Sequence, residues 1–83
     1  MLHIDDAAGG EHRQAFHSAA YRFWKMHQDE SLNVWSNGTW PDGFRVGIRT
    51  HRDKSPSSLV VQLGSDPEEA ILTALEKWWA ERQ

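Results

Sequence analysis

The sequence predicts a small α+β domain, a two-layer sandwich in which a helix, a two- or three-stranded antiparallel sheet and a second helix follow one another. Two observations carry this prediction. Two long segments have apolar residues at helical spacing, and the segments between them alternate apolar with polar residues. Because each helix has one apolar stripe and the sheet has one apolar face, we expect both helices on the same face of the sheet.

The first helix is expected from about Glu11 to Gln28. At roughly 100° per residue, its apolar side chains fall on one arc. The members of this arc are Phe16, Ala19, Ala20, Phe23, Met26 and His27. Residues 1–10 end in two alanines and two glycines, and we expect them to form a loose leader. The chain of 83 residues suffices for one domain and is too short for two, so residues 1–83 are assigned to a single domain.

The middle of the chain predicts strands joined by turns. Asn37-Gly38 and Pro41-Asp42-Gly43 are turn sequences, because Gly supplies left-handed backbone angles and Pro fixes φ. A strand over 32–36 is left open, whereas alternation predicts strands over 44–51 and 58–63. In the first of these two, the predicted buried side chains are Phe44, Val46, Ile48 and Thr50, and the predicted exposed residues are Arg45, Gly47, Arg49 and His51.

The second helix is expected to begin after Asp66 and to run to about Arg82. Asp66 suits the N-cap position, and Pro67 suits the first helical position that follows it. The apolar stripe predicted for this helix consists of Ala70, Ile71, Ala74, Leu75 and Trp78. Leu72 and Trp79 are seven residues apart and are expected to form a shoulder at one side of this stripe.

Composition argues against several classes of function. The formal net charge of −3 is modest, so the chain resembles neither an acidic DNA mimic nor a basic nucleic-acid binder. There is no Cys, and the spacing of the five His does not align two imidazoles on one helix face. We find no nucleophile motif and no phosphate loop. We therefore expect no cofactor, no metal site and no enzymatic activity.

Positive charge gathers in one region of the predicted sheet. Its members, which we call the basic strip, are Arg45, Arg49, His51, Arg52 and Lys54. Arg45 and Arg49 are four residues apart on a strand and therefore share the face that points away from the helices. One interpretation is a surface that grips phosphate or an acidic protein. The other is the ordinary polar side of a half-buried sheet.

Five Trp are many for a chain of this length. Trp35 and Trp40 flank the Asn-Gly turn, and we add them and Trp79 to the basic strip as the candidate partner surface. A thin core could instead need these rings for its own stability. If Leu72 and Trp79 are exposed together, they would form an apolar edge suited to a homodimer.

The order helix, strands, helix resembles the double-stranded-RNA-binding domain. That family grips phosphates through Lys residues at the start of its last helix. The corresponding residues here are Asp66-Pro67-Glu68-Glu69-Ala70, which carry the opposite charge. The resemblance therefore implies a similar topology, and the departure falls on the phosphate contact itself.

Residues 43–80 are also similar to small α/β sandwich proteins of bacteriophages and prophages, in which a strand pair precedes a helix like Ser65–Trp79, SDPEEAILTALEKWW. Such proteins, anti-CRISPR proteins among them, bind and disable a host complex. The resemblance implies a non-enzymatic inhibitor that binds a host protein or nucleoprotein complex. The alternative is a small nucleic-acid-binding module that uses the basic strip.

Since residues 1–6 lack a signal sequence and no long apolar run occurs, we expect a cytoplasmic protein without membrane contact.

Overall fold

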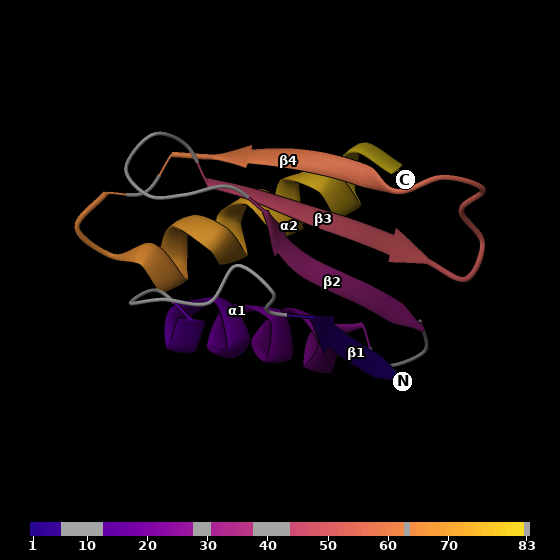
Figure 1. The fold of residues 1–83 in the computed structure, drawn as a ribbon, viewed down its shortest axis with the longest axis horizontal. Coiled ribbons are helices and arrows are strands. Elements are labelled where there is room, and N and C mark those ends of the chain that lie inside the picture. The colour runs from indigo at the N-terminus through magenta and orange to yellow at the C-terminus, as the bar shows by residue number, and fades with distance from the viewer. Residues whose placement is uncertain (6–12, 28–30, 38–43, 63, 83) are drawn as a thin grey trace.

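The computed structural model describes residues 1–5, 13–27, 31–37, 44–62 and 64–82 (Figure 1). These residues form an α+β domain, as predicted. The elements, in chain order, are β1 (Leu2–Asp5), α1 (Arg13–Met26), β2 (Leu32–Asn37), β3 (Phe44–Thr50), β4 (Ser57–Val61) and α2 (Pro67–Arg82). The predicted turns at 38 and 41–43 lie outside the described residues.

The strands form one mixed sheet in the order β1-β2-β3-β4. The two hairpin-connected pairs, β2–β3 and β3–β4, are antiparallel, whereas β1 runs parallel to β2. The predicted two- or three-stranded antiparallel sheet is thus too small and lacks the parallel pair. The chain segment between β1 and β2 contains α1, in keeping with the long crossover that a parallel pair requires.

Strand β1 lies inside the segment that the sequence predicts to be a loose leader, so that prediction is wrong for residues 2–5. Leu2 is paired with Leu32, and Ile4 with Val34. Leu2 and Ile4 are half-buried and pack against the core, whereas the side chains between and after them are exposed. The four residues therefore show the alternation of a half-buried strand.

The core lies between the helix layer and one face of the sheet. Its buried apolar members are Phe16, Ala19, Ala20, Phe23, Leu32, Val34, Val46, Ile48, Val61, Ile71, Leu72, Leu75 and Trp78. The strand residues in this set alternate with exposed or half-buried ones, apart from the buried Gly47 between Val46 and Ile48, so both helices pack on the same sheet face, as expected. Figure 1 shows α1 beside β1 and α2 behind β3 and β4. Two expectations fail: Met26, predicted on the buried arc of α1, is 54% exposed, and Gly47, predicted to be exposed, is buried. Leu72, predicted at the side of the stripe, belongs to the core.

The predicted start of α2 is confirmed. Asp66 Oδ1 accepts a hydrogen bond from the Glu69 backbone N–H at 3.2 Å, which satisfies one free donor of the first turn.

On α1, Arg22 forms ion pairs with Glu68 at 2.6 Å and with Glu69 at 3.1 Å. The acidic residues at the start of α2 therefore connect the two helices.

Candidate binding surface on the outer sheet face

One face of the sheet is left uncovered by the helices. The strand register arranges its side chains in rows: Asn33 is opposite Arg49, and Trp35 is opposite Gly47. We use the name outer sheet face for the residues that alternate with the core positions and whose side chains are described. They are His3, Asp5, Asn33, Trp35, Arg45, Gly47, Arg49, Ser58 and Val60.

Trp35 lies directly over Gly47. A Cβ atom placed on Gly47 would be 2.0 Å from Trp35 Cε2 and 2.3 Å from Nε1, which is far inside van der Waals contact. Gly47 therefore provides the space in which the indole rests against the backbone of β3. The result is a half-buried aromatic ring at the centre of the outer sheet face.

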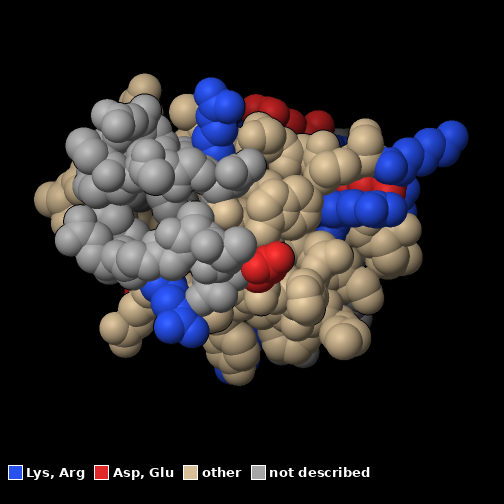
Figure 2. Space-filling model, in the orientation of Figure 1, with Lys and Arg blue, Asp and Glu red and all other residues tan. Residues whose placement is uncertain are grey.

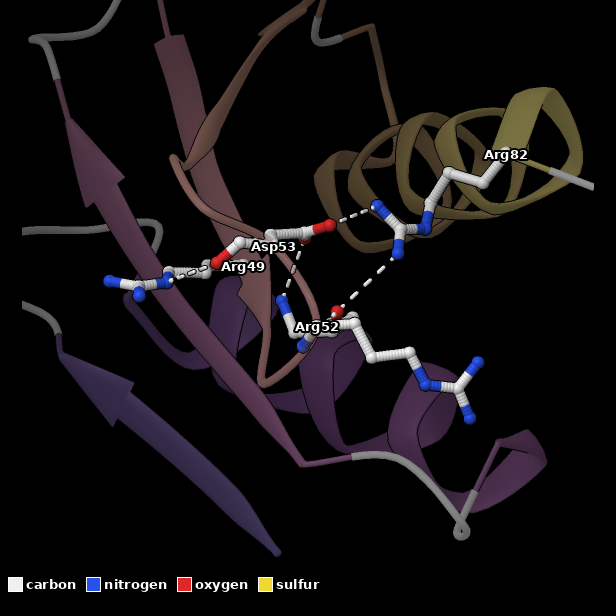
Figure 3. Close-up of polar contacts among 5 residues, drawn as sticks. Arg49, Arg52, Asp53 and Arg82 are labelled. Carbon is white, nitrogen blue, oxygen red and sulfur yellow. Dashed lines mark hydrogen bonds and ion pairs between the residues drawn. The ribbon is translucent and has the colours of Figure 1, made fainter.

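A polar network fixes the end of β3 and the turn that follows it (Figure 3). The Asp53 carboxylate accepts a hydrogen bond from the Thr50 backbone N–H at 2.9 Å and pairs with Arg82 of α2 at 2.7 Å. The Asp53 carbonyl accepts a hydrogen bond from Arg49 Nε at 3.2 Å. The buried Thr50 hydroxyl accepts from the Arg52 backbone N–H at 3.2 Å. The turn thereby orients Arg49 and is itself held by α2.

This network predicts a pH dependence of stability. The Thr50 backbone N–H, and with it the Arg82 guanidinium, holds the pKa of Asp53 below its ordinary value of 3.8. A carboxyl whose pKa is lowered by folding stabilises the fold above its unfolded pKa and loses that contribution as pH falls through the folded pKa. We expect Asp53→Asn to lower the free energy of unfolding by about 1–2 kcal/mol at neutral pH.

The measurement is urea unfolding of wild type and Asp53→Asn across pH 7 to about 2, over which an acid-titrating contribution disappears. The difference between the two proteins should shrink as pH falls below the ordinary pKa of Asp53. A difference that stays constant down to the lowest pH would show that the charge of Asp53 does not stabilise the fold.

Positive charge dominates the end of the molecule where the turn lies. Figure 2 shows Lys and Arg side chains gathered over the β3–β4 connection, with acidic atoms between them. Arg52 and Lys54 are exposed there. Asp53 lies between them in the sequence and forms an ion pair with Arg82. Arg82 thus neutralises the charge of Asp53, and the basic strip keeps its net positive charge.

The surface beside Arg49 is hollowed. The depression has a volume of about 580 Å³ and is open to solvent. Its lining includes one row of the outer sheet face, namely His3, Asn33 and Arg49, together with Met1, Ser31, Leu32, Thr50 and His51. Such a depression can receive a side chain of a partner next to the Arg49 guanidinium.

The structure unites most of the predicted site and separates one residue from it. Arg45, Arg49 and Trp35 share the outer sheet face, and the rest of the basic strip follows in the adjoining turn. His51 belongs to this turn rather than to the strand. Trp40 lies outside the described residues.

Trp79 belongs to the helix layer. Its ring is 4.3 Å from the His27 ring and 6.1 Å from the Phe23 ring, measured between centroids. It therefore lies on the other side of the sheet from Trp35. The condition for a homodimer edge at Leu72 and Trp79 is not met, because Leu72 is only 5% exposed and cannot contribute to a surface patch.

Sequence reasoning missed the contributions of His3, Asn33 and Arg82. His3 and Asn33 enter the site because β1 and β2 pair in register beside β3, and the alternation Leu2-His3-Ile4-Asp5 was the available signal for β1. Arg82 reaches Asp53 from the last turn of α2, across 29 positions of sequence. No local pattern indicates that contact.

Comparisons with known proteins add no family assignment: no family model matches the chain, and no curated protein or solved structure is significantly similar to it. Among the described residues, no group of three or more His, Cys, Asp or Glu is arranged to hold a metal ion. The helices of the described part of the chain are too short or too polar to cross a membrane.

Proposed function

We propose that the chain is a non-enzymatic protein-binding module whose outer sheet face and adjoining basic turn dock onto an acidic surface of a partner. The observation that carries this proposal is the gathering of Arg45, Arg49 and the half-buried Trp35 on the sheet face opposite to α1 and α2. On the sequence pattern of residues 43–80 alone, which resembles that of phage accessory proteins, we propose a host protein or nucleoprotein complex as the partner. Binding would inhibit this host complex in the cytoplasm.

The chemistry of this face supports a docking role. Trp and Arg are the side chains that most often dominate the binding energy of protein interfaces. Trp35 is seated against Gly47, and Arg49 is held at Nε by the Asp53 carbonyl. Side chains that are already oriented lose less conformational entropy on binding, so this face is prepared for a contact before the partner arrives.

The proposal is tested by affinity capture from a host-cell lysate, divided into nuclease-treated and untreated halves and read by mass spectrometry. We expect a protein partner in stoichiometric amount in both halves. If everything captured disappears after nuclease treatment, the chain binds nucleic acid and the protein-binding proposal is wrong.

Charge reversal on the outer sheet face is expected to weaken partner binding. The double variant R45E/R49E should raise the Kd for the captured partner by at least about tenfold, because like charges then face an acidic surface. The control K25E makes the same kind of charge change on α1, where Lys25 is exposed and lies 5.7 Å from the Tyr21 ring. Isothermal titration calorimetry should show little change for K25E. Because K25E changes the net charge by half as much as R45E/R49E, a loss of binding free energy half as large would indicate a general effect of net charge.

A nucleic-acid-binding module is the second candidate, favoured by the same arginines next to an exposed part of an aromatic ring. Stacking of bases on Trp35 and phosphate contacts to Arg45 and Arg49 would be its mechanism. Fluorescence anisotropy with labelled single-stranded and duplex oligonucleotides tests it. Binding that falls steeply as salt rises, and is lost in R45E/R49E, would favour this candidate over the protein-binding one.

A further inference from the structure

The outer edge of β4 has no partner strand among the described residues, since β4 stands last in the sheet order. An edge strand presents a row of backbone N–H and C=O groups that can pair with another strand. Proteins usually protect such edges with charged side chains, Pro, bulges or very short strands. The composition of an edge strand therefore indicates whether it is built to stay unpaired.

The two edges of this sheet differ in this respect. Edge strand β1 is four residues long and carries the exposed Asp5. Edge strand β4 reads Ser-Ser-Leu-Val-Val, with no charge and with two adjacent β-branched residues. Val60 on β4 is 67% exposed, among the most exposed large apolar side chains in the described part of the chain. Within Ser57–Val61, the β4 edge thus carries neither a charged side chain nor Pro to keep a strand from pairing.

A shallow groove runs between this edge and α2. It has a volume of about 220 Å³ and is lined by Ser58, Leu59, Val60, Ala74, Lys77, Trp78 and Glu81. Lys77 and Glu81 are one helical turn apart on α2 and are both exposed. Neither forms an ion pair within the part of the chain that the structure describes. The groove thus carries one positive and one negative group side by side.

We propose that β4 pairs with β4 of a second copy of this chain, antiparallel about a two-fold axis, so that two sheets join into one. A two-fold axis reverses the direction of α2, and in the proposed dimer it lies level with the midpoint between Lys77 and Glu81. Lys77 of each copy then comes opposite Glu81 of the other. The pattern of charge beside the edge is therefore self-complementary. The strands themselves bring no like charges together, because β4 has none.

This dimer would place two outer sheet faces on the same side of one continuous sheet. Arg45 is paired in register with Val60, so the basic residues of each copy would lie one strand away from the new junction. A partner with two acidic patches could then be held at both, which raises the overall affinity without a new type of contact. The dimer does not depend on the proposed function, because the β4 edge is not part of the basic strip.

The test is sedimentation equilibrium of the full chain at low salt. We expect a mass that rises with concentration from 9.6 kDa toward twice that value. The variants K77E and E81K should each raise the dimer Kd by about tenfold, because two attractive contacts become repulsive. The double variant K77E/E81K restores opposite charges across the axis and should return the Kd to that of wild type.

The control is E76K, which changes an exposed acid on the same helix that does not line the groove and should leave the dimer Kd unchanged. Circular dichroism of each variant checks that the fold is retained. A chain that stays at the monomer mass up to about 1 mM has no dimer of useful strength and would overturn the proposal. A dimer whose Kd ignores both single variants, or is not restored in the double variant, would overturn the two-fold arrangement.

Discussion

Replacing Phe23 by alanine should lower the free energy of unfolding by about 3–5 kcal/mol, the usual loss when a buried aromatic ring is removed. Phe23 is fully buried at the centre of the helix layer. Its ring lies 6.4 Å from the Trp78 ring and 4.8 Å from the His27 ring, so its loss leaves a cavity between α1 and α2. A domain of this size has a few kcal/mol of stability to lose, and we expect the variant to be largely unfolded near body temperature.

Urea unfolding followed by circular dichroism measures this effect, with Arg49→Ala as the comparison. Arg49 is exposed on the outer sheet face, so its replacement should change stability by no more than about 0.5 kcal/mol. If Arg49→Ala proved more damaging than Phe23→Ala, the assignment of inner and outer sheet faces would be reversed.

Replacing Gly47 by valine should cost about 1–3 kcal/mol and displace Trp35, although valine is the better strand former. The reason is the 2.0 Å separation between a Cβ at this position and Trp35 Cε2, which forces the ring to leave the backbone of β3. The loss should appear in thermal melts together with a change in near-ultraviolet circular dichroism. Displacement of Trp35 should also weaken partner binding.

A double-mutant cycle isolates the cause. In a Trp35→Ala background the space above Gly47 is empty, so Gly47→Val should cost much less there or should stabilise the strand. The same loss in both backgrounds would mean that Gly47 is required for a reason other than the indole above it.

The sequence predicted the elements whose signals are local. The helical spacing around Phe23, the Asp66-Pro67 start of α2 and the alternation through β3 each depend on residues that are neighbours in the chain. The exposed positions of Arg45 and Arg49 followed from the same alternation. The open question of a strand over 32–36 is answered by β2.

The features that were missed depend on contacts between distant segments. The four residues of β1 alternate apolar with polar side chains, but they form a strand by pairing with β2, 30 positions further along, and that pairing has no local signal. Leu72 is buried because α2 packs against both α1 and β4, whereas helical spacing alone placed it at the side of the stripe. The ion pair between Asp53 and Arg82 likewise joins residues that are distant in the sequence. The sequence therefore predicted that Arg45 and Arg49 lie on the outer sheet face. It did not predict that the turn at Asp53 orients Arg49.

The most direct measurement is nuclear magnetic resonance mapping of backbone amides as the captured partner is added to isotope-labelled chain. We expect shifts that concentrate in β2, in β3 and in residues 51–54, with Arg49 and Trp35 at their centre. We expect little change at exposed positions of α1 such as Tyr21 and Lys25. Shifts confined to α1 and α2 would contradict the assignment of the outer sheet face as the binding surface.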